Sequence, residues 1–407
     1  MSTIHTPRAG DQSQRSGSTW KPTQILPKHV TYASFIAFLA WFFSVYDFNM
    51  FGTLLPKIRV AFGWSNGFAT TVSDLVSVAT FLAALCVGPL IDHFGRRLSM
   101  IFTTAAAAVS SGLTGLTITS IAAPWIIVVR YFSGFGYSEQ AVNSTYLNEL
   151  YASVEDDTQR NNRGFLYSLV QGGWPLGVMF GAAIVALVLP GVGWRGTFLI
   201  ATFPAVIIAL LGRRLKESPK YEVLKRAREL EAEGRTEEVA ELKREYGVDL
   251  GDKSSKPSYA SLFEPAIIRH TLFLCVGFLL NWFGVQVLSV LSTTVLTNGK
   301  HISYSSSLIV VIISNSVAFV GYMLAGYLGD RIPRRNVIGV GWLCSGVCYL
   351  LMLYVVNGYW PVVILNALGL FFLIGPYSAL LFYMGESYPT RYRASGASFA
   401  NAMGPIG

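Results

Sequence analysis

The sequence predicts an all-α polytopic membrane protein built from two related halves. Hydrophobic residues make up 52% of the 407 residues and charged residues only 13%, against roughly 25% charge in a soluble domain. Apolar segments of about 20 residues, each long enough to cross about 30 Å of hydrocarbon, recur along the chain. A ten-residue motif follows one such segment in each half. A repeat of this kind indicates a duplicated unit.

The apolar segments predict ten complete membrane helices and the beginning of another. The complete helices are expected at about 30–55, 68–91, 98–119, 124–148, 164–189, 194–212, 268–295, 304–328, 334–356 and 360–384. An eleventh begins near Ala394 and reaches Gly407. Two matching six-helix halves imply twelve helices, so we expect the chain to end within helix 11.

The segments outside the helices complete the predicted organisation. Residues 1–29 are rich in Ser, Thr and Gln and lack the apolar core of a signal peptide, so we expect a disordered cytoplasmic tail. Residues 30–212 form the N-terminal half and residues 269–407 the C-terminal half, which looks truncated. Residues 213–268 form a central cytoplasmic loop. Its opposite charges at helical spacing predict a solvated helix over residues 221–246, interpreted as a spacer in preference to a partner-binding site.

The positive charges predict the orientation in the membrane. With the amino terminus inside, the tail, the central loop and the connections on the same side hold 26 of the 31 Lys and Arg residues. This is a strong positive-inside bias. The net charge of +8 is therefore a topological signal, and we do not expect nucleic acid as a partner. The expected location is the plasma (inner) membrane, with a cytoplasmic amino terminus.

The repeated motif reads G-x-L-x-D-x-x-[GP]-R-R, from Gly88 to Arg97 and again from Gly326 to Arg335. It resembles the loop between helices 2 and 3 of the major facilitator superfamily and its weaker echo between helices 8 and 9. The resemblance implies the major facilitator fold, in which two six-helix halves enclose a binding site.

Charged residues at the inner helix ends predict an inner gate. A carboxylate there can accept hydrogen bonds from the N–H groups of a helix start, and Arg can bind carboxylates and carbonyl ends. Glu149 in the first half and Glu386 in the second add a further charged element. The predicted gate residues are Gly88, Asp92, Gly95, Arg96, Arg97, Glu149, Arg163, Gly326, Asp330, Arg334, Arg335, Glu386, Arg391 and Arg393.

Ionisable residues inside the predicted helices mark the expected proton pathway. A charge at mid-bilayer costs about 2.5–3.5 kcal/mol on insertion scales, so few are kept without a use. Asp47, Asp74, Arg130 and Glu139 are the candidates, all in the first half. In an ideal helix, Glu139 points to the side opposite Arg130. It is interpreted either as a second coupling site or as the acceptor of a structural hydrogen bond. Asp74 lines an outer vestibule or satisfies a helix-end contact.

Residues 130–136 read R-x-x-x-G-x-G, which resembles helix 4 of proton-coupled members of the superfamily. There the Arg pairs with an acid on helix 1. The resemblance implies that Asp47 is the proton acceptor and Arg130 its partner, and a conformational change that separates them would load or release a proton. The alternative is a static structural pair.

Gly173, Gly177 and Gly181 recur every four residues along helix 5. Small residues at this spacing allow two helices to approach closely. In the superfamily that this chain resembles, helix 5 packs across the interface between the halves, so the stripe is expected there. Packing within one half is the alternative.

Further short segments resemble the sialate/lactate and related metabolite:proton symporters. They are Y-D-F at 46–48, Q-G-G-W-P-L-G at 171–177, G-W-R at 193–195 and E-S-P at 217–219. The resemblance implies a secondary active transporter that imports a small organic anion, a carboxylate, with protons. The alternatives are a sugar or polyol symporter and a non-transporting nutrient sensor on the same fold.

The substrate is expected at mid-membrane, between helices 1, 4, 7 and 10. The polar candidates for contacting it are Tyr46, Arg130, Tyr137, Gln171, Asn281, Gln286 and Tyr377. Neither a nucleophile–base constellation nor metal-ligand spacing is present, so we expect no enzyme, metal or organic cofactor. The expected partners are the substrate, protons and the lipid bilayer, around a monomer.

Overall fold

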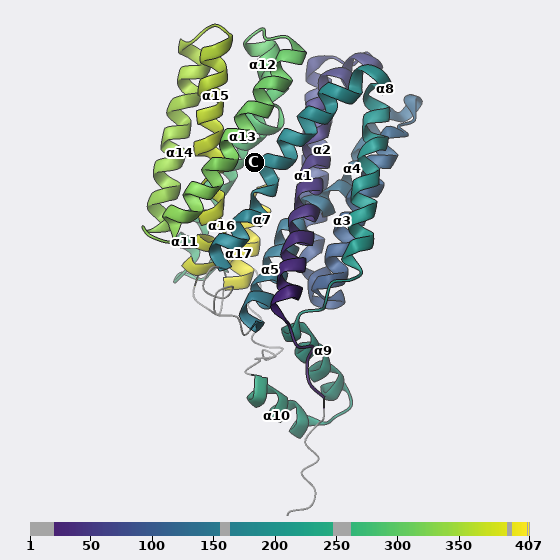
Figure 1. Cartoon of the computed structure of the whole chain (residues 1–407), viewed down its shortest axis with the longest axis vertical. Helices are drawn as coiled ribbons and strands as arrows, with labels where there is room; N and C mark the ends of the chain where they lie inside the picture. Colours follow the sequence, from purple (N-terminus) through teal and green to yellow (C-terminus); the bar gives the residue numbers. More distant parts are fainter. Residues whose placement is uncertain (1–19, 155–162, 247–261, 389–392, 405, 407) are drawn as a thin grey trace, which may run out of the picture.

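The computed structural model describes residues 20–154, 163–246, 262–388, 393–404 and 406, and these ranges contain helices and no strand. Two groups of long helices stand side by side (Figure 1). The first half of the chain, purple to teal, forms one group, and the second half, green to yellow, forms the other. The predicted all-α membrane architecture is confirmed at this level.

The first group contains the helices up to Gly212. Gly63, in the left-handed region at φ 66°, ends the first helix, and Ser65 caps the second by accepting a hydrogen bond from the Phe68 N–H. The helices are α1 (Pro27–Phe62), α2 (Asn66–Phe94), α3 (Arg96–Gly115), α4 (Ala122–Tyr137), α5 (Glu139–Ser153), α7 (Arg163–Gln171) and α8 (Gly173–Gly212), with the 3-10 turn η1 (Thr119–Ile121).

The second group repeats this arrangement after the central segment. Its helices are α11 (Ile268–Val285), the π-helix η3 (Gln286–Val290), α12 (Ser292–Gly299), α13 (Tyr304–Gly329), α14 (Arg334–Leu350), the π-helix η4 (Leu351–Val355), α15 (Tyr359–Ile374), α16 (Tyr377–Ser387) and α17 (Arg393–Ala402). The last of these corresponds to the start of the predicted eleventh helix.

Several predicted helices are joined or divided differently in the structure. The predicted helices 164–189 and 194–212 are joined in α8, which bends at Gly193 where φ is 68°. The predicted helix 124–148 is divided at Ser138 into α4 and α5. Eight helices in the described ranges are long and apolar enough to cross a membrane. One of them covers two predicted helices, and the divided helix is not among the eight because its pieces are short.

The central segment forms two short helices, α9 (Pro219–Ala232) and α10 (Thr236–Tyr246), beyond one end of the bundle (Figure 1). They replace the single solvated helix predicted over 221–246. Part of the predicted tail lies against them: the Thr23 backbone N–H and hydroxyl donate to Glu222 at 2.6 and 2.8 Å. Residues 1–19 lie outside the described part of the chain.

The two groups of helices touch where α7 and α8 pack against α13 and α16. They also touch at the end opposite the repeated motifs, here named the far end. The Tyr304 hydroxyl of α13 donates to the Thr53 carbonyl of α1 at 2.9 Å. A Cβ at Gly52 would lie 2.6 Å from the Val290 carbonyl oxygen, so only glycine allows this approach. The end that carries the repeated motifs is named the motif end.

The glycine stripe of α8 packs within the first group and not across the interface. A Cβ at Gly177 would lie 2.5 Å from the Phe42 carbonyl oxygen of α1, and one at Gly181 would lie 3.0 Å from the Tyr46 ring. The glycine that does approach the second group is Gly172, just before α8, whose Cβ would lie 2.7 Å from the Phe319 ring of α13. The prediction that the stripe lies at the interface was therefore wrong.

The α1–α8 contact gives a stability prediction. Gly177→Ala inserts a methyl group against an immovable backbone oxygen, so we expect destabilisation of about 1–3 kcal/mol, measured as a lower thermal unfolding midpoint in detergent. Gly277→Ala, in α11, is the matched control because its Cβ would meet nothing within 4 Å. Equal midpoints for the two variants would contradict the close α1–α8 packing.

Candidate functional site

Helices α1 and α4 bring Asp47 and Arg130 together inside the first group of helices. The residues are 4% and 1% exposed, respectively. The Arg130 Nη1 donates to the two carboxylate oxygens of Asp47 at 3.1 and 3.2 Å. The contact that the sequence suggested across the bundle is therefore present, as a fully desolvated ion pair.

Further groups surround this ion pair. The Ser133 hydroxyl of α4 donates to Asp47 Oδ2 at 2.7 Å, and the Ser111 hydroxyl of α3 donates to Oδ1. The guanidinium also binds the Asp47 carbonyl at 3.1 Å through Nη2 and lies against the rings of Phe51 and Phe198. Removing either charge would leave the other buried without a partner, which is costly.

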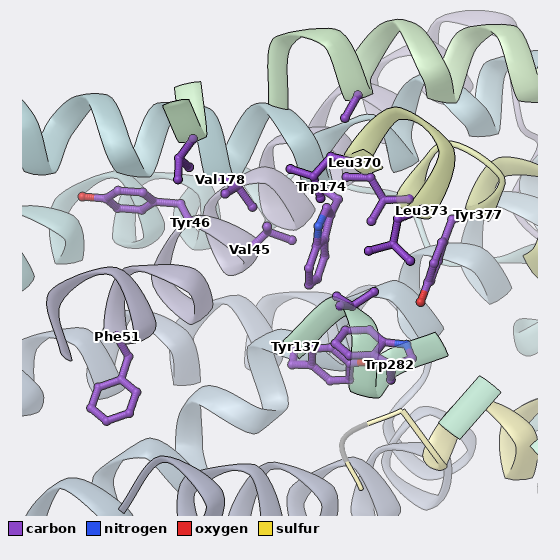
Figure 2. Close-up of a cluster of buried hydrophobic side chains, with 14 of the residues drawn as sticks. Val45, Tyr46, Phe51, Tyr137, Trp174, Val178, Trp282, Leu370, Leu373 and Tyr377 are labelled. Carbon is purple, nitrogen blue, oxygen red and sulfur yellow. The ribbon is translucent and has the colours of Figure 1, made fainter. Parts of the chain in front are cut away.

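A cavity of about 210 Å³ lies between the two groups of helices, near the middle of their length. Aromatic rings form much of its wall: the Tyr137 ring centroid is 5.3 Å from those of Phe48 and Trp282. Figure 2 shows Tyr137, Trp174 and Trp282 gathered at this place. The cavity is lined by Phe48, Asp74, Ser77, Val78, Thr80, Phe81, Tyr137, Trp282, Gln286, Gly404 and Ile406.

Of the predicted substrate residues, Tyr137 and Gln286 line this cavity. Asn281 and Tyr377 are adjacent to it, since Tyr377 packs against Trp282 and its hydroxyl donates to the Asn281 side-chain oxygen at 2.5 Å. Each of these two side chains therefore has a hydrogen-bond partner in the other.

Three predicted substrate residues lie elsewhere. Tyr46 packs against Phe180 and Gly181 of α8, and Gln171 binds Gln140 at 2.9 Å inside the first group. Arg130 is not part of the cavity wall because Asp47 holds its guanidinium within the first group. The pairing that the sequence suggested thus excludes direct contact between Arg130 and the substrate in this conformation.

Among the described residues that line the cavity, one has a charged side chain, Asp74 of α2. It is exposed there. Of the two roles left open by the sequence, this geometry agrees with a vestibule-lining residue.

Glu139 begins α5 and is fully buried. The Thr103 hydroxyl of α3 donates to one carboxyl oxygen, and the other has no hydrogen-bond partner among the described atoms. Glu139 therefore faces a neighbouring helix and not the cavity, in agreement with its expected direction.

Apart from Tyr137, the aromatic and hydroxyl residues of the cavity wall were not among the predicted site residues. Phe48 directly follows Asp47, and Trp282 directly follows Asn281. Ser77 lies one helical turn after Asp74 on the same face of α2. Phe48 and Trp282 could have been found in the sequence only because each lies directly next to a buried polar candidate.

At the motif end, a compact polar network joins α3, α5 and the segment before α9. Arg96 binds Glu149 through two hydrogen bonds of 2.9 Å. The Glu217 carboxylate accepts from the Arg96 and Arg97 backbone N–H groups at 3.0 and 3.3 Å, which caps the start of α3. Burial raises the pKa of Glu217, and these N–H donors partly offset the increase.

Glycine is required at one position of this network. Gly95 has φ 89°, and its Cβ would lie 2.6 Å from a Glu217 carboxylate oxygen. Arg97 extends past the network and donates to the Arg213 carbonyl at 2.5 Å. These contacts join the first half to the start of the central segment, so the network stiffens that half and does not bridge the two halves.

The second copy of the motif is more open. Asp330 binds Arg334 at 3.2 Å, but its side chain is 51% exposed. Gly326 is the copy's contact with the first half, since its Cβ would lie 3.2 Å from Ser168 of α7. Arg335 borders an apolar groove, and Gly88 has open space around it. The predicted gate residues outside the described residues or side chains are Asp92, Arg163, Glu386, Arg391 and Arg393.

The difference between the two motif copies gives a prediction. Glu149→Gln removes the carboxylate that directly binds the buried Arg96 guanidinium, so we expect a loss of about 3–5 kcal/mol. Asp330→Asn, the matched control, removes an exposed ion pair worth about 0–1 kcal/mol. Thermal unfolding of the purified variants checks this. A loss in Asp330→Asn as large as in Glu149→Gln would contradict the assignment of the stabilising network to the first half.

Similarity to known proteins agrees with this architecture. The sequence matches the Major Facilitator Superfamily over residues 37–407. It is 24% identical over 391 residues to the niacin transporter NiaP of Acinetobacter baylyi, covering 91% of this chain and 82% of that protein. It is 25% identical over 380 residues to the putative niacin/nicotinamide transporter NiaP of Bacillus subtilis, covering 91% and 84%.

The fold has solved counterparts. The D-xylose-proton symporter superposes with a TM-score of 0.66 at 16% sequence identity, covering 93% of this chain and 88% of that chain. This likeness shows the fold alone, and the finer resemblance to sialate and lactate symporters stays a prediction. The match over residues 37–407, the two groups of membrane helices and the cavity between them agree: the chain belongs to the major facilitator superfamily and is a multi-pass membrane transporter, not an enzyme.

Proposed function

We propose that this transporter imports a small organic anion, a carboxylate, together with protons by alternating access. The observation that carries the proposal is the buried Asp47–Arg130 pair directly behind the cavity wall. Arg130 Nη2 lies 3.5 Å from the Phe48 carbonyl oxygen, and the Phe48 side chain lines the cavity. A change in the charge of the pair is therefore felt inside the cavity.

The electrostatics of the pair supply the coupling. When Asp47 is ionised, the pair is neutral overall and offers no net attraction to an anion. A proton on Asp47 leaves Arg130 as a buried cation without compensation, which is costly on its own. An anion in the adjacent cavity supplies that compensation. Each ligand then binds more tightly in the presence of the other, as thermodynamic linkage requires.

The cavity wall supports a small, planar acid. Its volume of about 210 Å³ is below the roughly 300–1,000 Å³ of pockets for drug-sized ligands. The rings of Phe48, Tyr137 and Trp282 offer faces and edges for stacking, and Gln286 offers a hydrogen bond. Two relatives are named as niacin transporters, and niacin is a small aromatic carboxylic acid.

The charge distribution of the chain supports an orientation with a cytoplasmic amino terminus in the plasma (inner) membrane. The motif end then faces the cytoplasm and the far end faces outside. Import requires the contacts at Gly52 and Tyr304 to separate while the substrate and proton load. The same contacts close before release at the motif end. A monomer suffices for this cycle because the residues that line the cavity all come from one chain.

A sugar or polyol symporter is the second candidate. Gln286, Ser77 and Thr80 provide amide and hydroxyl groups at the cavity, and the fold is that of a xylose symporter. A thermal-shift panel of niacin, benzoate, lactate, xylose and a polyol on the purified protein separates the two. Stabilisation by carboxylates alone supports the proposed function, and stabilisation by xylose alone overturns it.

Asp47→Asn tests the proton site. The amide imitates the protonated carboxyl and preserves the shape of the pair, so the loaded carrier should still alternate. We expect substrate exchange across proteoliposome membranes to remain substantial, while accumulation driven by a pH gradient is lost. Arg130→Ala should reduce both, because the buried carboxylate loses its partner. Accumulation by Asp47→Asn in response to external acid would place the coupled proton elsewhere.

Trp282→Leu tests the aromatic wall. Aromatic contacts are worth about 0.5–1.5 kcal/mol beyond their buried area, so KM for an aromatic acid should rise about 2- to 12-fold. KM for an aliphatic acid such as lactate should change less. Phe283→Leu is the control, because Phe283 is an exposed residue next to Trp282 on α11. An equal rise for both acids in Trp282→Leu would show that the ring does not select planar substrates.

A further inference from the structure

The first half contains a second buried carboxyl whose surroundings differ from those of Asp47. Glu139 is 0% exposed and Asp47 is 4% exposed, so both are removed from water. Asp47 receives a guanidinium and two hydroxyl groups. Glu139 receives one hydroxyl hydrogen bond, from Thr103, and forms no ion pair among the described residues.

Two buried cations on the neighbouring helices are already bound by other carboxylates. Arg96 of α3 holds Glu149, and Arg130 of α4 holds Asp47. The ionisable group that faces Glu139 from α7 is the phenol of Tyr167, which supplies no positive charge. An ionised carboxylate here would be a buried charge without compensation, whereas a protonated carboxyl is neutral. The geometry therefore favours a carboxyl that holds a proton.

A cluster of buried polar groups lies beside Glu139 and is linked to it through the electrostatic interaction with Tyr167. Gln140, the next residue, binds Gln171, whose amide nitrogen donates to the Tyr167 hydroxyl at 2.7 Å. The neighbouring Asn143 side-chain nitrogen is fully buried and has no hydrogen-bond partner among the described atoms. These polar groups lie on α5 and α7, and α7 packs against α13 and α16 of the second half. Movement of the halves therefore changes the environment of this cluster.

Glu139 lies at a break in its helix. α4 ends at Tyr137, Ser138 has φ −76° and ψ 0°, and α5 begins at Glu139. The Tyr137 ring lines the substrate cavity, so the break joins the cavity wall to the buried carboxyl within two residues. A substrate that displaces Tyr137 can thereby act on Glu139 through the backbone.

We propose that Glu139 is a second proton-carrying site, so that two protons accompany each organic anion. The inference rests on the proposed function and fixes its stoichiometry. The sites are distinct: their partners on α3, Ser111 and Thr103, are eight residues and so about 12 Å apart along the helix. One proton is carried on Asp47 and one on Glu139, and both are released on the opposite side. A monovalent carboxylate with two protons moves one net positive charge inward per cycle.

The net charge moved in each cycle can be tested by measuring how uptake depends on the membrane potential. Proteoliposomes containing the wild-type protein are given an inward proton gradient, and uptake of labelled niacin, benzoate and lactate is measured at fixed membrane potentials. Net movement of one charge predicts that equilibrium accumulation rises about tenfold for each 60 mV of inside-negative potential. Glu139→Gln should still accumulate substrate in response to external acid, with no dependence on the potential.

Thr103→Val is the matched control. It removes the hydrogen bond to Glu139 but keeps the carboxyl, so the dependence on potential should remain. Loss of that dependence in Thr103→Val but not in Glu139→Gln would show a structural role. Acid-driven accumulation by the wild-type protein that ignores the potential overturns the second site and leaves the proposed function intact. No acid-driven accumulation of any of the three acids overturns both, and the wild-type result decides even if Glu139→Gln does not fold.

Discussion

The buried ion pair between Asp47 and Arg130 connects three helices of the first half, because Ser111 of α3 and Ser133 of α4 complete its hydrogen bonds. A neutral pair of this kind is stable in a dry interior only while both charges are present. The pair is therefore a two-state element: it is either intact, or one member has been neutralised by a proton. Proton coupling, in the proposed mechanism, uses this property, and Phe48 carries its effect to the cavity.

The other contacts of the first half hold the helices around that pair rigidly. The contacts between the two halves are of a kind that can separate. At the motif end, Glu149, Arg96 and Glu217 bind α3 to α5 and to the segment before α9. The glycine contacts of α8 hold α1 closely. The first half can thus move as one unit with its carboxyls inside it. The contacts between halves are made through small or aromatic groups, such as Gly326 against Ser168 and Gly52 against Val290, which can separate without breaking buried ion pairs.

The sequence predicted the helices, the repeated motif and the Asp47–Arg130 contact, because each depends on local pattern or on depth in the membrane. It did not predict the partners of the motif. Arg96 meets Glu149 and Glu217 because the chain returns to the same surface after α8. The spacing of residues in the sequence does not predict this return. The glycine stripe predicts a close helix–helix contact. Which helix the stripe faces depends on how α8 is rotated about its axis.

The direction of side chains in helix 4 was only partly predictable. An ideal helix places Arg130 and Tyr137 on one side, yet Tyr137 lines the cavity while the guanidinium of Arg130 turns toward Asp47. The length of the Arg side chain and the attraction of the carboxylate decide its direction. Phe48 and Trp282 in the cavity wall were missed because they lie next to the polar candidates in the sequence and resemble ordinary membrane packing residues.

Infrared difference spectroscopy can detect proton binding to Asp47 directly, since a protonated carboxyl has a C=O stretch that a carboxylate lacks. Spectra of the purified protein are recorded before and after addition of the carboxylate that stabilises it. We expect the anion to drive protonation of Asp47, so that a new carboxyl C=O band appears in the wild-type protein and is absent in Asp47→Asn. A wild-type spectrum without the new band, or the same band in Asp47→Asn, would contradict the coupling of anion binding to this ion pair.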